Sequence, residues 1–344
     1  MAVVNPPQHG GDLQRAMASY GGMASDWLDC SSGISPYPYP LPPVPREVWQ
    51  RLPGQDETLL AAARAYYGTR QLLALPGSQA AIALLPQLRA RSRVGVITPA
   101  YAEHAWQWRQ AGHSVIELTA DDVEAQLPGL DVLVLVNPNN PTALQHPAAR
   151  LLAWQATLAE RGGWLLVDEA FADLDGTHSL LPHIGLPGLV VLRSVGKFFG
   201  LAGIRLGFAA AEPTLLAALQ TRLGPWTVSA PAQWAGSLAL QDLAWQTTQR
   251  QRLQEDSRWL SATLTEAGLA PAGQLPLLYW CPTPHAAAWQ AALAREWLWC
   301  RRFSEPAGLR FGLVAQHQRT LFLRRLSAAR MVLSSNPSLI TEAP

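Results

Sequence analysis

Residues 189–210 read LVVLRSVGKFFGLAGIRLGFAA, and this stretch decides how the rest of the chain is interpreted. It opens with an expected strand at 189–194, whose first four residues are an apolar run, and closes with a second run at 206–210. Continuously apolar runs of this length are typical of strands that are covered on both faces of a sheet. Between the two runs lie Lys197, which follows Gly196, and Arg205, which is two residues from a glycine on either side. The pattern therefore places an amine and a guanidinium in the connection between two buried strands.

Lys197 is the single lysine of the chain, because the other 25 of the 26 basic residues are arginine. Arginine stays protonated in proteins, whereas a lysine amine can lose its proton and attack a carbonyl carbon. A lysine that survives in such a composition indicates covalent chemistry. The alternative is chance retention in an arginine-biased chain.

Working outward, short apolar runs alternate with helical stretches. The expected strands are 93–98, 114–118, 131–137, 164–168, 189–194 and 206–210. The expected helices are 78–91, 102–111, 147–161 and 213–223. This alternation predicts an α/β domain built on a mainly parallel sheet.

The two ends of the chain have a different character. Residues 35–45 (SPYPYPLPPVP) hold six prolines, which exclude regular helix and central strand and predict an extended arm. After residue 225 the pattern becomes helical over 230–268. Short strands at 277–281, 298–303 and 308–314 and a closing helix at 317–326 are expected after it. We therefore expect an N-terminal arm at 1–50, a large domain at 51–225, a smaller α+β domain at 226–333 and a frayed tail at 334–344.

The composition excludes several classes of protein. With 49% hydrophobic residues the chain can bury a large core, and its net charge of +1 argues against nucleic acid or an anionic membrane as partner. The N-terminus lacks the pattern of a signal peptide, and no apolar run is long enough to span a membrane. Cys30, Cys281 and Cys300 are odd in number and widely spaced, which predicts reduced thiols in a cytoplasmic protein. No spacing of metal ligands is present, so no metal is expected.

Polar motifs follow several of the expected strands. Gly77, Ser78 and Gln79 open a helix, where free backbone N–H groups suit a phosphate; an ordinary helix cap has the same pattern. Asn140 lies in NPNNPT (137–142) at the carboxyl end of a strand, where open α/β sheets bind ligands, although this loop could be a plain turn. Asp168 ends the next strand, where a carboxylate needs a partner or caps a helix.

The set of motifs GSQ, NPNNPT, DEAF, SVGK and GIRLG, in this order, resembles the class I and II aminotransferase family of pyridoxal-5′-phosphate (PLP) enzymes. The resemblance covers almost the whole chain and implies the fold type I architecture, with a PLP-binding large domain, and a homodimer. It implies that Lys197 binds PLP as a Schiff base, that Asp168 pairs with the pyridine nitrogen and that Asn140 bonds the 3′ oxygen. It further implies that Tyr101 lies against the ring and that Arg310 clamps the substrate carboxylate. The residues implied for the cofactor phosphate are Gly77, Ser78, Gln79, Ser194 and Arg205.

Two positions depart from the family pattern. Phe171 stands where many relatives have a tyrosine that donates to the 3′ oxygen, and Leu52 stands where relatives often have a tyrosine that reaches a neighbouring subunit's cofactor. Asn140 and Arg205 remain to serve the same groups. Neutral drift and a change in mechanism both stay open as explanations.

The N-terminal segment narrows the resemblance. HGGD (9–12) and DCSSGISP (29–36) resemble the branch of the family that decarboxylates L-threonine O-3-phosphate to (R)-1-aminopropan-2-ol O-phosphate in cobalamin biosynthesis. The residues implied for substrate binding are His9, Ser32, Gly33, Arg301 and Arg310. An arm that only wraps the dimer partner is the alternative for His9. For the whole chain the alternative is an aminotransferase for histidinol phosphate or an aromatic amino acid, and a catalytically silent PLP fold is disfavoured because Lys197, Asp168, Asn140 and Arg205 are all present.

Overall fold

The computed structural model describes residues 6–7, 9–54 and 56–335. These residues pack into two compact units, which are described separately. The large unit consists of 6–7, 38–140 and 144–247, and the small unit of 9–37, 141–143 and 248–335. Residues 226–247 therefore pack with the large unit. The boundaries expected from the sequence, at 50 and 225, stay predictions.

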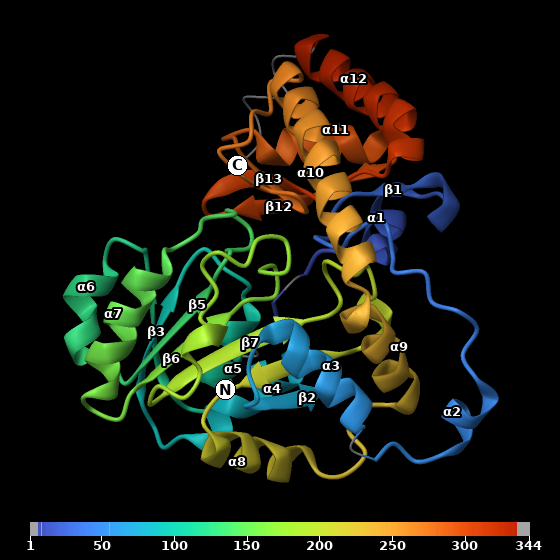
Figure 1. The fold of residues 1–344 in the computed structure, drawn as a ribbon. Helices are drawn as coiled ribbons and strands as arrows, with labels where there is room; N and C mark the ends of the chain where they lie inside the picture. Colours follow the sequence, from blue (N-terminus) through green and yellow to red (C-terminus); the bar gives the residue numbers. More distant parts are fainter. Residues whose placement is uncertain (1–5, 8, 55, 336–344) are drawn as a thin grey trace. The chain divides into compact units, whose positions relative to one another are not determined.

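The large unit is built on a seven-stranded sheet with the order β2-β8-β7-β6-β5-β3-β4 (Figure 1). Its five parallel strands are β3 (Arg93–Ile97), β4 (Ser114–Leu118), β5 (Val132–Val136), β6 (Trp164–Asp168) and β7 (Leu189–Ser194). The strand β8 (Gly207–Ala210) runs antiparallel to β7 and to β2 (Leu72–Leu75). The predicted α/β fold with a mainly parallel sheet is confirmed.

The helices of the large unit include the predicted ones. They are α2 (Arg46–Gln50), α3 (Glu57–Tyr67), α4 (Ser78–Leu84), α5 (Glu103–Gln110), α6 (Val123–Gln126), α7 (Ala148–Ala159), α8 (Pro213–Leu223) and α9 (Ala230–Gln241). Of these, α2, α3 and α6 were not predicted. The predicted helix at 78–91 was wrong beyond Leu84. A 3-10 turn follows at Leu85–Leu88, because Pro86 has no backbone N–H to continue the helix.

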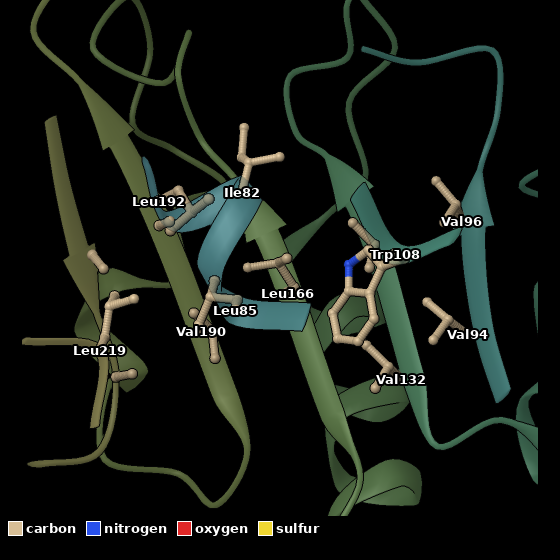
Figure 2. Packing of buried hydrophobic residues seen from close by; sticks show 14 of the residues in the cluster. Ile82, Leu85, Val94, Val96, Trp108, Val132, Leu166, Val190, Leu192 and Leu219 are labelled. Carbon is tan, nitrogen blue, oxygen red and sulfur yellow. The ribbon is translucent and has the colours of Figure 1, made fainter. Parts of the chain in front are cut away.

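One face of the sheet packs on a continuous apolar core. Alternate residues of the strands point to this face, as the two-residue period of a strand requires, and they meet side chains from α4, α5 and α8 (Figure 2). Burial of an aliphatic side chain of this size stabilises a fold by roughly 1.5–3 kcal/mol. The core thereby fixes the carboxyl ends of the strands, from which the site is built. The residues labelled in Figure 2 are Ile82, Leu85, Val94, Val96, Trp108, Val132, Leu166, Val190, Leu192 and Leu219.

The small unit is α+β. Its four-stranded antiparallel sheet has the order β12-β13-β10-β9, and a parallel pair joins β1 to β11. The strands are β1 (Leu28–Asp29), β9 (Gly273–Leu275), β10 (Leu278–Pro282), β11 (Leu298–Trp299), β12 (Arg301–Ser304) and β13 (Ala307–Phe311). The helices are α1 (Leu13–Tyr20), most of α10 (Leu243–Glu266), α11 (Ala286–Arg295) and α12 (Arg319–Ser335).

The predicted closing helix was wrong at its end. The closing helix α12 continues past the expected end at 326 and includes Ser334 and Ser335. Residues 336–344 of the predicted tail lie outside the described residues. In the part of the chain that the structure describes, no helix combines the length and the apolar character needed to cross a membrane.

The proline-rich segment 35–45 has no regular secondary structure, as predicted. Its beginning is tied down within the small unit. The Tyr37 hydroxyl donates to Oδ2 of the buried Asp256 at 2.5 Å, and the Gln249 amide donates to the Ser35 hydroxyl at 2.8 Å. These contacts fix the backbone that directly follows Ser32 and Gly33.

Candidate active site

The predicted cofactor residues of the large unit gather at one edge of its sheet. Asn140 follows β5, Asp168 and Ser194 are the last residues of β6 and β7, and Tyr101 follows β3. Lys197 lies three residues beyond β7. Since β7, β6, β5 and β3 are parallel neighbours, their carboxyl ends meet at the same edge. The fold therefore places these side chains as the sequence motifs predicted.

Asp168 has a buried partner that the sequence analysis did not single out. Its Oδ2 lies 3.0 Å from Nε2 of His104 on α5, and its Oδ1 accepts a hydrogen bond from the Ala170 N–H at 3.0 Å. The side chains of His104 and Asp168 are only 1% and 5% exposed. Because a carboxylate only accepts, this contact requires the proton on Nε2. His104 thus fixes the orientation of the carboxylate.

Tyr101 and Gln79 belong to one hydrogen-bonded group. The Tyr101 hydroxyl donates to Oε1 of Gln79 at 3.2 Å, and Nε2 of Gln79 donates to Glu103 at 2.9 Å. The Tyr101 ring also meets the His104 ring edge-on, with centroids 6.2 Å apart. Burial, helped by the charges of Glu103 and Asp168, raises the pKa of Tyr101 to about 12. Tyr101 is therefore a neutral phenol at physiological pH, and the Gln79 side chain is held by protein groups.

The predicted phosphate residues form a narrow cradle. Gly77 has φ +79°, and a Cβ atom at this position would lie 2.7 Å from Nη2 of Arg205. A Cβ atom on Gly207 would lie 2.6 Å from the backbone nitrogen of Ser78. These two glycines thus let β8 and the start of α4 approach closely. As a result, the Arg205 guanidinium lies beside the first backbone N–H groups of α4, an arrangement that suits an anionic phosphate.

Lys197 has an aromatic neighbour. Its Nζ lies 5.8 Å from the ring centroid of Phe171, which is buried. The position where relatives carry a hydroxyl is therefore an apolar wall beside the amine. Ser194, also predicted for the phosphate, is buried, and its hydroxyl accepts from the Gly196 N–H at 3.4 Å.

The loop that carries Asn140 is held by its other asparagines. Nδ2 of Asn139 donates to the carbonyl of Pro99 at 2.8 Å, in the loop that follows β3. Asn137 exchanges two hydrogen bonds with the backbone of His146. Asn140 is half-buried in this fixed loop, so its position is set by the residues around it.

The predicted substrate residues gather in the small unit. Arg301 on β12 is the register partner of Arg310 on β13, and Nη1 of Arg301 donates to the carbonyl of His9 at 3.3 Å. Arg310 is buried and donates to the carbonyl of Ser31. Burial, together with the charge of Arg301, lowers the pKa of Arg310 to about 10. Two cations at paired positions of neighbouring strands favour an anionic ligand.

Ser32 and Gly33 follow in the same segment. The carbonyl of Ser32 lies against Gly312, where a Cβ atom would come within 2.0 Å of it. Gly33 is buried and Ser32 is half-buried. The small unit thus holds all five predicted substrate residues, with His9, Arg301 and Arg310 directly linked.

The fold and the lysine site define a class of protein, and sequence comparison agrees with it. Residues 48–326 match the model of the family described as aminotransferase class I and II. The chain belongs to this family.

Two curated relatives are similar over nearly their whole length. The threonine-phosphate decarboxylase of Pseudomonas aeruginosa is 51% identical, over 90% of this chain and 93% of its own. The threonine-phosphate decarboxylase of a Sinorhizobium species is 41% identical over the same shares. Among solved structures, the histidinol-phosphate aminotransferase of Sinorhizobium meliloti in complex with pyridoxal-5′-phosphate has a TM-score of 0.80 at 19% identity, covering 97% of this chain and 99% of that one. This last likeness shows the fold alone.

Proposed function

We propose that this chain is a PLP-dependent decarboxylase that converts L-threonine O-3-phosphate to (R)-1-aminopropan-2-ol O-phosphate in cobalamin biosynthesis. The relatives at 51% and 41% identity carry the name of this activity. The observation in the structure that carries the proposal is the pairing of Arg301 with Arg310 beside His9. A substrate with both a carboxylate and a phosphate needs two cationic anchors, which this pair supplies.

The residues of the large unit fit PLP. The cofactor needs an amine for its aldehyde, a carboxylate for its pyridine nitrogen and an anion cradle for its phosphate. Lys197, Asp168 and the Gly77–Arg205 cradle provide one of each. PLP supplies an electron sink that stabilises the negative charge left when a bond at the Cα atom of an amino acid breaks.

The residues of the protein orient the reacting groups and supply the proton that this chemistry needs. His104 fixes the orientation of the Asp168 carboxylate, so that Asp168 would accept a hydrogen bond from a protonated ring nitrogen. Tyr101 presents an apolar ring face and keeps its phenol proton. The amine of Lys197 binds the cofactor and, when free, can deliver to Cα the proton that replaces the lost carboxylate.

We propose that the enzyme works as a homodimer in the cytoplasm. The exposed large apolar side chains of the large unit include Trp49, Leu52 and Trp226, which are 66%, 71% and 60% exposed. Pro53, next to Leu52, and Trp226 line one cavity of about 400 Å³. Apolar side chains that gather on a surface mark interfaces, so a second copy is the expected occupant. The described cysteines are free thiols, in keeping with a reducing compartment.

The test is to incubate the PLP-loaded protein with L-threonine O-3-phosphate while CO₂ and the amine product are measured together. Equal amounts of CO₂ and aminopropanol phosphate are expected. If CO₂ is absent while 2-oxoglutarate accepts an amino group from histidinol phosphate, the enzyme is the alternative aminotransferase. The dimer is tested by light scattering of the protein as it elutes from a size-exclusion column, where a molar mass of twice the chain mass is expected.

A further inference from the structure

The small unit contains a cavity of about 230 Å³ between its N-terminal helix and the edge of its sheet. Helix α1 lines it with Arg15, and the edge strand β12 lines it with Arg301 and Arg302. Two carboxylates, of Asp12 and Glu305, also face it. A water molecule needs about 10–15 Å³ of such space, so the cavity can take a small anion together with several waters.

Arginines outnumber carboxylates among the residues that line this cavity. Arg301 is half-buried, and its pKa is lowered first by burial and then by the charges of Arg15 and Arg302. Arg310, the register partner of Arg301, carries a further positive charge, and burial and the charge of Arg301 both help to lower its pKa. The carboxylate of Asp12 is directed to the backbone, where its Oδ1 accepts from the Arg15 N–H at 3.1 Å. A multivalent anion between Arg15 and Arg301 would relieve this repulsion.

The cap formed by Asp12 also determines where Arg15 stands. It begins α1 at Leu13, so that Arg15 lies in the first turn of the helix and faces the cavity. The bond from Arg301 to the His9 carbonyl ties the segment before α1 to β12. Cations from two different elements therefore approach the cavity from two sides, whereas Arg310 is not among its lining residues.

The proposed function already places an anionic group of the substrate at Arg301, which lines this cavity. We propose that Arg15 is a further specificity-determining residue, which binds the substrate phosphate together with Arg301 and so selects a phosphorylated amino acid over the free hydroxy amino acid. This inference rests on the proposed function. A phosphate monoester brings close to two negative charges and three strong acceptor oxygens, which can accept from Arg15 and Arg301 together. A free hydroxyl offers no charge to either. Arg310, outside the cavity, is then left for the substrate carboxylate.

The experiment uses the PLP-loaded enzyme and the variants Arg15→Gln, Arg15→Lys and Arg324→Gln. Arg324 is an exposed arginine on α12 of the same unit and does not line the cavity. Its variant therefore removes the same charge as Arg15→Gln without changing the cavity. Binding of inorganic phosphate is measured by calorimetry, and KM and kcat are measured with L-threonine O-3-phosphate. A charge-assisted bond of this kind corresponds to about a tenfold change in affinity.

The expected result is that Arg15→Gln weakens phosphate binding and raises KM about tenfold with kcat unchanged. Arg15→Lys should recover part of the loss, and Arg324→Gln should behave as the unaltered enzyme. If Arg15→Gln and Arg324→Gln bind phosphate equally well, the role of Arg15 is refuted even where CO₂ is released. If phosphate binding depends on Arg15 but no CO₂ forms, the cavity assignment stands and the decarboxylase does not.

Discussion

Replacement of His104 by phenylalanine tests how much the site depends on the contact between His104 and Asp168. The substitution keeps an aromatic ring in a site that is 1% exposed but removes the Nε2 donor, 3.0 Å from the carboxylate. A hydrogen bond to a charged group contributes about 1.5–3 kcal/mol. If that bond serves the reaction, kcat should fall roughly 10- to 150-fold, because each 1.36 kcal/mol is a factor of ten in rate.

His113 provides a matched control. It is also buried, and its ring accepts from the Ser92 N–H at 3.1 Å and contacts the Pro86 carbonyl at 2.8 Å, with no contact to Asp168 among the described residues. His113→Phe should therefore lower the melting temperature but leave kcat nearly unchanged. His104→Gln, which keeps an N–H donor, should recover part of the rate. Equal kcat values for His104→Phe and the unaltered enzyme, with both saturated with PLP, would refute the assigned role.

Three further predictions concern the cofactor residues. Lys197→Arg should abolish turnover and the yellow colour that borohydride bleaches, because a guanidinium cannot form the bond to PLP; spectra before and after reduction check this. Gly77→Ala should weaken PLP retention in dialysis, since its Cβ would meet Arg205, whereas Gly68→Ala has a similar positive φ but open space around it and should retain PLP normally. The pKa of Tyr101, about 12, lies above its ordinary value of 10. Its contribution to stability is therefore complete below pH 10 and is lost as the pH rises towards 12. The free energy of unfolding of Tyr101→Phe, measured by denaturant titration at each pH, should therefore fall less steeply between pH 10 and 12 than that of the unaltered protein.

The sequence predicts the sheet well because its strands are continuous apolar runs. All six expected strands of the large unit exist, with ends displaced by at most one residue. The strand β2 escaped prediction because LLAL (72–75) is too short to show a period, and its place beside β8 is set by long-range pairing. Helix α4 ends early because of Pro86, a local signal that the helical pattern around it obscured.

The candidate site could be predicted as far as chain order determines it. Parallel strands bring their carboxyl ends together, so the motifs after each strand had to meet at one edge. His104 was missed because it stands inside an expected helix, and only its position three residues after Tyr101 hinted at the site. The pairing of Arg301 with Arg310 depends on the register of β12 and β13, and a shift of one residue would turn the opposite face of β12 towards its partner.

The lone lysine has a practical consequence for the study of this protein. Reagents that attack lysine amines have a single side chain to find, and it stands next to Phe171 in the large unit. A mass shift from amine labelling on the peptide that contains Lys197 would therefore report access to this one position rather than an average over a surface. Bound substrate or product could be followed by how strongly it protects that amine, without any engineered probe.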